Sequence, residues 1–404
     1  MSLIRPFRGL RPDAAHAAAV IAPPYDVLSS AEAREAVTGR PLSFLRVSKA
    51  EVDLPAGTAS TDEAVFRQAA ANWTRLRSEV LIRDAQPCYY CYELTMGNHV
   101  QKGLVVVASV GAYTEGRIRR HEFTRPDKER DRVRHIEALN AQTGPAFLTF
   151  RADPEIAALL ARASEGPAAA DAVLQGVRHR LWVVAGADLI AALTAAFERL
   201  PRVYIADGHH RTAAAAIVAA SRGPGEGPHR WFLSVLFPDN EMQILNYDRV
   251  VADLNGRSGE GFLQALSPIF EVLPEEAPVR PKAPAEFGMY LEGRWYRLRT
   301  RDALPQDPVA RLDVSLLQDR VLAPLLGITD PRRDQRIDFV GGIRGPAALA
   351  ERVDRRGGVA FTLYPTGLGD LMTVADRGEV MPPKSTWFEP KLADGLVSYS
   401  LEDG

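Results

Sequence analysis

Hydrophobic and polar positions alternate along this chain with two periodicities, one typical of helices and one typical of strands. Apolar residues recur every three or four positions over residues 61–81, which predicts an amphipathic helix. Residues 88–94 and 102–110 are rich in β-forming side chains and flank a turn at 96–99, which predicts an antiparallel hairpin. The unbroken apolar run at 104–107 indicates that the second strand is covered on both faces.

The middle of the chain continues this mixture of strands and helices. An apolar run at 202–206 predicts a strand, and the alanine-rich segment 212–220, which Gly223-Pro224 ends, predicts a helix. Further strands are predicted at 43–47, 146–150, 180–185 and 231–237, and further helices at 126–140, 153–165 and 188–200. Residues 100–250 therefore combine strands and helices around one sheet.

The last third of the chain has its own mixture of predicted helices and strands. A segment rich in Asn, Gly and Ser at 252–260 indicates a boundary, and a hairpin is predicted at 287–298. We expect an α+β protein with a mixed sheet. We divide it into an N-terminal α/β segment (1–100), a core (101–252) and a C-terminal α+β domain (253–404).

Composition and charge narrow the class of protein. The 404 residues are 46% hydrophobic and 25% charged, which is ordinary for a globular chain. The net charge of −2 gives no overall field that would attract nucleic acid or a membrane surface. With no apolar stretch of 18 residues and no apolar leader, we expect a soluble cytoplasmic protein. The sequence does not specify an oligomeric state.

The candidate chemistry centres on residues 207–211, which read Asp-Gly-His-His-Arg between the predicted strand and the predicted helix. A strand–turn–helix aims backbone N–H groups and the positive end of the helix dipole at one point, which suits an anion. Arg211 adds a forked cation, so a phosphate is the expected guest. Asp207 could hold Mg²⁺ or take a proton.

A structural interpretation of the same five residues stays open. Asp207 can cap the helix, the glycine can serve the turn, and His-His-Arg can form a solvated first turn. The segment also lacks the glycine spacing and the Gly-Lys-Ser/Thr ending of a Walker A loop. It is therefore not an ordinary P-loop.

A second group of polar residues surrounds His121 and Glu122. They precede Thr124 and a predicted helix on which Lys128 and Arg132 lie on related faces, and sites are commonly built at such strand ends. The alternative is a solvated helix face with salt bridges. A His-Glu-x-x-His zinc motif is excluded, because position 125 is an arginine.

Two proline-bounded segments carry further candidates. Tyr25 and Asp26 follow two prolines, and they either form a wall of the site or only stabilise an N-terminal arm. Lys384, Ser385 and Thr386 offer a cation and two hydroxyls for an anion or a substrate, although such loops are more often ordinary surface.

Five short motifs in order resemble those of one uncharacterised protein family, the domain of unknown function 1015. The motifs are Pro6-Phe7-Arg8-Gly9, Ala22-Pro23-Pro24-Tyr25-Asp26-Val27, His121-Glu122-Phe123-Thr124, Asp207-Gly208-His209-His210-Arg211 and Met381-Pro382-Pro383-Lys384-Ser385-Thr386-Trp387-Phe388. The five motifs occur in the same order as in the family and extend over nearly the whole chain. Together they are therefore more specific than any single motif.

The resemblance implies a ParB/sulfiredoxin-like core in residues 101–252, with N- and C-terminal α/β extensions. Related proteins with that fold phosphorylate free L-serine to O-phospho-L-serine, which implies a kinase with ATP or ADP as donor and Mg²⁺ as cofactor. The implied catalytic residues are Glu122 as base, Asp207, which is also the metal ligand, and His210. The residues expected to bind the nucleotide phosphates are Gly208, His209, His210 and Arg211. The residues expected to contact the substrate or to support the site are His121, Thr124, Lys128, Arg132, Tyr25, Asp26, Lys384, Ser385 and Thr386.

Two other activities known for this fold are disfavoured by the residues of this chain. Sulfiredoxins carry a reactive cysteine in the corresponding turn, whereas the two cysteines here, Cys88 and Cys91, lie elsewhere. A DNA clamp is disfavoured by the net charge and by the lack of an obvious recognition helix. The alternative to a kinase is therefore a nucleotide-binding, ParB-like regulatory or DNA-binding protein without turnover. The expected partners are a nucleotide and a small-molecule substrate, with no membrane.

Overall fold

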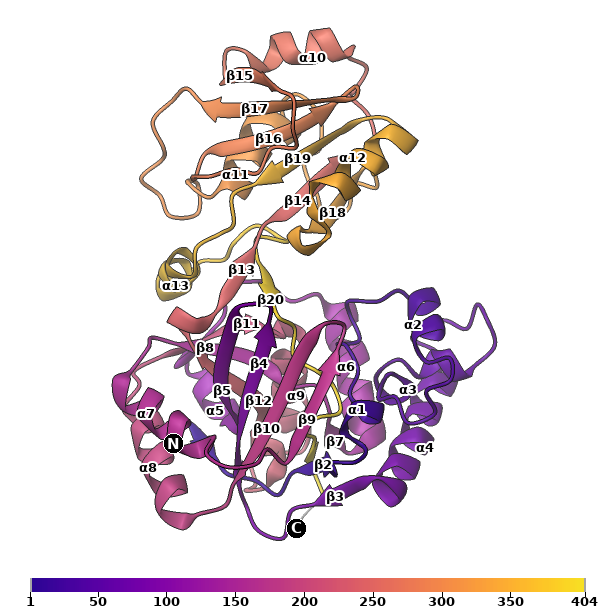
Figure 1. Cartoon of the computed structure of the whole chain (residues 1–404), viewed down its shortest axis with the longest axis vertical. Helices are drawn as coiled ribbons and strands as arrows, with labels where there is room; N and C mark the ends of the chain where they lie inside the picture. The colour runs from indigo at the N-terminus through magenta and orange to yellow at the C-terminus, as the bar shows by residue number, and fades with distance from the viewer. Residues whose placement is uncertain (1, 403–404) are drawn as a thin grey trace. The chain divides into compact units, whose positions relative to one another are not determined.

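The computed structural model describes residues 2–402. The chain forms two units, of which the first comprises Met1–Met242 with Pro390–Gly404 and the second Gln243–Glu389. Figure 1 shows that each unit is built on its own β-sheet. The candidate site at residues 207–211 belongs to the first unit.

A nine-stranded mixed sheet organises the first unit (Figure 1). Its strands are β1 (Ile4–Arg5), β4 (Tyr89–Met96), β5 (His99–Ser109), β6 (Ile118–Arg119), β8 (Ala146–Phe150), β9 (Ala170–Leu174), β10 (Val177–Val184), β11 (Val203–Asp207) and β12 (Trp231–Pro238). Their order is β6-β11-β8-β12-β5-β4-β10-β9, and β1 pairs with β5. The pairs β11/β6 and β12/β8 are parallel and the others are antiparallel. The predicted α+β class with a mixed sheet is confirmed.

Helices and two small ribbons complete the first unit. The helices are α1 (Ala17–Val20), α2 (Ser30–Ala36), α3 (Leu45–Ser48), α4 (Glu63–Glu79), α5 (Val110–Thr114), α6 (Pro126–Leu139), α7 (Pro154–Ala163), α8 (Ala187–Glu198) and α9 (His209–Ser221). The ribbons pair β2 (Leu10–Pro12) with β3 (Leu81–Arg83), and β7 (Ala141–Gln142) with β21 (Tyr399–Ser400).

The predicted hairpin at 88–110 is present as β4 and β5, which pair from Tyr90 and Val105 to Met96 and His99 at the turn. The run at 104–107 is buried at every position, as its unbroken apolar pattern predicted. The side chains of Leu104 and Val106 join a core cluster with residues of helices α7, α8 and α9. Strand β5 is therefore buried on both faces of the sheet. It pairs with β12, β12 pairs with β8, and β8 pairs with β11, the strand that ends at the candidate site.

The strand predicted at 43–47 is wrong. These residues enter the short helix α3, where Leu45 and Val47 are buried. Phe44, at the N-cap, packs edge-on against Trp73 of α4 with ring centroids 6.1 Å apart. Contact with a neighbouring helix therefore overrode the β preference of the local residues.

The second unit contains a six-stranded antiparallel sheet in the order β15-β17-β16-β19-β14-β18. These strands are β14 (Tyr247–Val251), β15 (Phe270–Glu275), β16 (Glu286–Leu291), β17 (Arg294–Thr300), β18 (Ile337–Gly341) and β19 (Val359–Leu363). Its other elements are α10 (Gly259–Leu266), α11 (Asp313–Leu317), α12 (Gly345–Arg356), α13 (Leu368–Asp376) and the paired strands β13 (Gln243–Leu245) and β20 (Trp387–Glu389). The hairpin predicted at 287–298 is confirmed as β16 and β17.

The two units differ from the three segments predicted at 1–100, 101–252 and 253–404. Strand β5 crosses the boundary at 100/101, and its hydrogen bonds join both sides in one sheet. Strand β14 pairs with β18 and β19 of the second unit. The chain returns to the first unit at Pro390, and β21 pairs with β7 there. The boundaries of the two units therefore follow from strand pairing between distant residues, which the local composition of the sequence does not predict.

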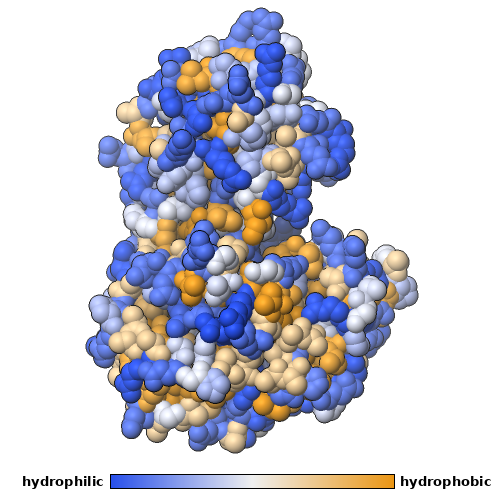
Figure 2. Space-filling view, in the orientation of Figure 1, coloured by the Kyte–Doolittle hydropathy of each residue, from blue (hydrophilic) through white to orange (hydrophobic). Residues whose placement is uncertain are grey.

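The molecular surface is mostly hydrophilic on the face shown in Figure 2, where hydrophobic side chains form small separate patches. Within the described residues, no helix combines the length and the apolarity that crossing a membrane requires. Scattered apolar residues of this kind are normal on a protein surface and identify no site by themselves.

Candidate functional site

The turn at residues 207–211 has the predicted strand–turn–helix form. Strand β11 ends at Asp207, Gly208 adopts φ 90° and ψ 28°, and α9 begins at His209. A Cβ atom on Gly208 would lie 3.1 Å from Nε of Arg211 and 3.2 Å from Cα of Ala146. Left-handed backbone and close neighbours together require glycine here.

The N-cap residue of α9 provides no side-chain cap for the first turn of this helix. Gly208 is the N-cap residue, and it has no side chain that could cap the helix. Asp207 instead accepts a hydrogen bond from the Gly208 N–H, with a distance of 2.7 Å between nitrogen and Oδ1. Asp207 therefore precedes the N-cap residue and does not occupy the N-cap position itself, and anion binding at this helix terminus stays a prediction.

The Asp207 carboxylate is surrounded by positive charge. Its Oδ2 lies 3.3 Å from Nζ of Lys391, and its Oδ1 lies 4.0 Å from Nη2 of Arg211. Burial acts to raise its pKa, but the charges of Lys391 and Arg211 outweigh burial and hold the pKa far below the usual range. Mg²⁺ would have to compete with Lys391 for this carboxylate, so Asp207 fits a metal ion poorly. Its metal role stays a prediction.

Arg211 is a buried and fixed cation. Its side chain is only 12% exposed, and Nη1 donates a hydrogen bond of 2.5 Å to the Pro145 carbonyl oxygen. Burial acts to lower the pKa of Arg211, but the nearby charges of Asp207 and Asp26 raise it above its ordinary value. The guanidinium is therefore permanently charged and has little conformational freedom to lose when it binds an anion.

The loop before α6 is attached to the start of α9. Nε2 of His210 accepts a hydrogen bond of 3.1 Å from the Arg125 N–H. The Thr124 hydroxyl donates to the Glu129 carboxylate, while Lys128 is exposed on the first turn of α6. The structure thus places Thr124 and Lys128 near His210, and their supporting role in a site stays a prediction. Burial lowers the pKa of His210, which favours the neutral ring.

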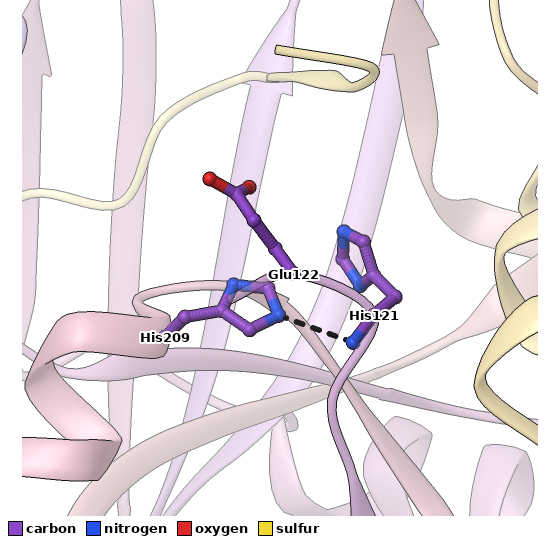
Figure 3. Close-up of side chains that lie close together, drawn as sticks. All are labelled: His121, Glu122 and His209. Carbon is purple, nitrogen blue, oxygen red and sulfur yellow. Dashed lines mark hydrogen bonds between the residues drawn. The ribbon is translucent and has the colours of Figure 1, made fainter. Parts of the chain in front are cut away.

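His121, Glu122 and His209 form a cluster at the start of α9 (Figure 3). The first two come from the loop after β6, and His209 is the first residue of the helix. The two imidazole rings meet edge-on with centroids 4.5 Å apart, and the His121 N–H faces Nε2 of His209 at 3.5 Å. One potential metal-ligand atom from each of the three residues lies within 4.8 Å of the other two.

Both histidines of this cluster are buried, with 1% exposure for His121 and 6% for His209. Burial lowers the pKa of His121 to about 4, although a hydrogen bond to the Ile205 backbone acts in the opposite direction. Burial, with the adjacent His121, also holds the pKa of His209 well below its ordinary value. At neutral pH both rings are therefore uncharged and each has a nitrogen lone pair.

A small pocket of about 30 Å³ lies beside Arg211. Arg132 and Tyr25 line it, with the Arg132 guanidinium stacked 3.8 Å from the centre of the Tyr25 ring. Burial raises the pKa of Tyr25 to about 12, so its hydroxyl stays protonated. The structure thus brings Tyr25 and Arg132 together with Arg211, while Asp26 is exposed nearby and acts on Arg211 through its charge.

Sequence reasoning did not single out two residues of this region, Lys391 and Asp394. Asp394 lines the pocket, and burial raises its pKa to about 7, although Arg211 acts against this rise. One signal was present: Asp394-Gly395 repeats the Asp-Gly step of residues 207–208, and Gly395 also has a positive φ of 83°.

The raised pKa of Asp394 predicts a pH dependence of stability. A carboxyl whose pKa rises from 3.8 to about 7 on folding stabilises the protein fully below pH 3.8. This contribution is lost as the pH rises through 7. The amide in Asp394→Asn cannot ionise, so the melting temperature of the variant should fall less between pH 5 and pH 8 than that of the wild type. An identical fall in both proteins would show that Asp394 does not titrate in this range.

Lys384, Ser385 and Thr386 belong to the second unit. There the Ser385 hydroxyl donates to the Pro382 carbonyl at 2.6 Å, and Nζ of Lys384 lies 5.6 Å from the centre of the Tyr247 ring. Arg249 donates to the Lys384 carbonyl at 3.0 Å. The loop is therefore anchored within its own unit, and its predicted role in binding an anion or a substrate stays a prediction.

Comparison with known families decides the family of the chain. A protein-family model described as "Protein of unknown function (DUF1015)" matches residues 4–315. This chain belongs to that family. The predicted family is confirmed, and four of the five motifs lie within the matched residues, while the motif at 381–388 lies outside them. No curated protein matches the sequence.

Several solved structures resemble the chain at low identity. SbnI with C-terminal truncation from Staphylococcus aureus is 13% identical and has a TM-score of 0.39, with 72% of this chain and 85% of that chain covered. A free serine kinase in complex with AMP is 12% identical, with a TM-score of 0.36 and coverage of 70% and 86%. A conserved hypothetical protein from Pyrococcus furiosus is 14% identical, with a TM-score of 0.37 and coverage of 72% and 93%.

Proposed function

We propose that this protein is a phosphotransferase that moves a phosphoryl group from a nucleotide to a hydroxyl of a small metabolite. The single observation that carries the proposal is the turn between β11 and α9. There, Gly208 adopts a left-handed backbone at the start of α9, and the side chain of Arg211, four residues after Asp207, is only 12% exposed. Our best candidate for the acceptor is free L-serine, which the family resemblance suggested, and the product would be O-phospho-L-serine.

The phosphates of ATP or ADP would lie against the first turn of α9. The N–H groups of this turn and the helix dipole favour an anion, typically by about 0.3–1 kcal/mol for the dipole. The Arg211 guanidinium can give two parallel hydrogen bonds to phosphate oxygens. In this proposal Gly208 allows the close approach of the phosphate, and His209 and His210 frame it.

The reaction would be an in-line displacement at phosphorus. The acceptor oxygen forms a bond to the terminal phosphorus as the bond from that phosphorus to the nucleotide oxygen breaks. The leaving nucleotide carries the electron pair of the broken bond. The proton of the acceptor hydroxyl passes to a carboxylate, which we assign to Glu122. Arg211 stabilises the negative charge on the phosphoryl oxygens as it moves.

A second candidate is a nucleotide-responsive binding protein without turnover. It is favoured by the pairing of Asp207 with Lys391 and Arg211, since binding needs only the phosphate cradle and neither a metal nor a base. Turnover separates the two candidates.

The test is a search for a new phosphoester. The full chain is incubated with ATP or with ADP, with Mg²⁺ in the buffer and a serine-containing amino-acid pool, and the products are followed by phosphorus NMR and mass spectrometry. We expect O-phospho-L-serine with one of the two donors, and much less of it with Arg211→Ala. Nucleotide binding without any phosphoester would support the binding protein, and no nucleotide binding would contradict both candidates.

A further inference from the structure

The cluster of His121, Glu122 and His209 has a geometry close to that of a metal site. Zinc binds imidazole nitrogen and carboxylate oxygen at about 2.0–2.2 Å in tetrahedral geometry, so two ligands of one ion are roughly 3.3–3.6 Å apart. The three potential ligand atoms here already lie within 4.8 Å of one another. Figure 3 shows them on two segments that meet at the start of α9. Small side-chain rotations would bring all three to one ion.

An independent observation concerns the ring of His121. Its Nδ1 is buried and has no hydrogen-bond partner among the described residues. A buried polar atom without a partner costs about 1–3 kcal/mol, and such an atom in a native protein calls for an explanation. A metal ion bound to Nδ1 would supply the missing partner.

The surroundings of the two rings also suit a metal ligand. The His121 side chain is buried, in a residue with 1% exposure, so the surroundings of the ring exclude most of the water that would compete for an ion. Nε2 of His209 makes only a long contact of 3.5 Å with the His121 N–H, which is at the limit of a hydrogen bond. Little is therefore lost if this ring turns toward an ion.

We propose that His121, Glu122 and His209 bind one divalent first-row transition-metal ion, such as Zn²⁺, through two imidazole nitrogens and one carboxylate oxygen. Imidazole nitrogen suits zinc, iron, copper and nickel, whereas Mg²⁺ prefers oxygen ligands. Three protein ligands leave at least one coordination position open for water or a substrate oxygen. The site is therefore of the open type found in metalloenzymes, and it differs from the Mg²⁺ assigned to Asp207.

This inference goes beyond the proposed function and does not depend on it. The ion needs one oxygen of Glu122, and the other oxygen keeps lone pairs that can accept a proton. Metal binding and a base role are thus compatible in the same carboxylate. Because metal binding is measured without nucleotide or acceptor, its failure says nothing about phosphoryl transfer, and a failure of phosphoryl transfer says nothing about the ion.

The test is a titration of the metal-free full chain with Zn²⁺, followed by calorimetry. We expect one ion per chain and a higher melting temperature in its presence, because an ion that binds only the folded state stabilises it. His121→Gln and His209→Gln should each weaken Zn²⁺ binding by more than about 100-fold, since loss of an outer-shell partner alone costs 10–100-fold. His99→Gln removes a histidine outside the cluster and should bind Zn²⁺ as the wild type does.

Glu122→Gln covers the case in which a buried histidine variant fails to fold. Glu122 is only half-buried, and the variant keeps both imidazoles, so it should remain folded and bind Zn²⁺ at least about tenfold more weakly. The visible spectrum of bound Co²⁺ should also change in this variant, because one ligand of the ion changes. The proposal is overturned if wild type takes up no ion, or if folded Glu122→Gln binds Zn²⁺ as tightly as wild type with the same Co²⁺ spectrum.

Discussion

Replacement of Arg211 by alanine is expected to lower the affinity of this protein for ATP or ADP by roughly ten- to a hundredfold. A hydrogen bond to a charged group contributes about 1.5–3 kcal/mol, and Arg211 would make at least one to the phosphates. The guanidinium is already held by the Pro145 carbonyl, so wild type loses little freedom on binding. Calorimetric titration with each nucleotide measures the change.

The control for this variant is Arg211→Lys, which keeps the charge and removes the planar fork. We expect its affinity to lie between those of wild type and Arg211→Ala. Lys391 remains beside Asp207 in both variants, so neither leaves that carboxylate without a cation. Equal affinity in all three proteins would mean that residues 207–211 only connect a strand to a helix.

The features that sequence alone predicted correctly are local ones. The hairpin of β4 and β5 follows from two β-forming runs on either side of a Gly-Asn turn. The start of α9 follows from Gly208 and the alanines after it, because the left-handed backbone and the helix propensity are properties of neighbouring residues. Such information lies within a few positions and needs no knowledge of the rest of the fold.

The parts that the sequence did not predict depend on distant contacts. Lys391 reaches Asp207 from 184 positions away, because the chain returns to the first unit after Pro390. The helix α3 replaces a predicted strand because Trp73 packs on Phe44. In both cases the local residues are compatible with several structures, and a partner far along the chain selects one.

The histidine cluster shows the same limit at the level of chemistry. A search for His-Glu-x-x-His fails at Arg125, and this excludes only a site built on one helix. The structure brings His209 to His121 across 88 positions. The His-Glu step and the His-His step were each visible in the sequence, but only the pairing of β6 with β11 places one next to the other.

Glu122→Gln is expected to lower turnover by about 10²–10⁴ while nucleotide affinity stays near that of wild type. The amide keeps the shape of the side chain but cannot accept the proton of the acceptor hydroxyl. Nucleotide affinity should persist, because the contacts assigned to the phosphates come from residues 207–211. Initial rates of phosphoester formation and a parallel calorimetric titration measure the two quantities.

The matched control is Glu115→Gln, the same change at an exposed position after α5, and its turnover should equal that of wild type. The pattern of loss then assigns the role of Glu122. If turnover falls and nucleotide affinity does not, Glu122 acts on the acceptor. If both fall together, its carboxylate instead holds the structure of the site or an ion that the nucleotide needs. Unchanged turnover would contradict a base role for Glu122 and move that role to Asp207, the other carboxylate predicted to be catalytic, although Asp207 would first have to separate from Lys391.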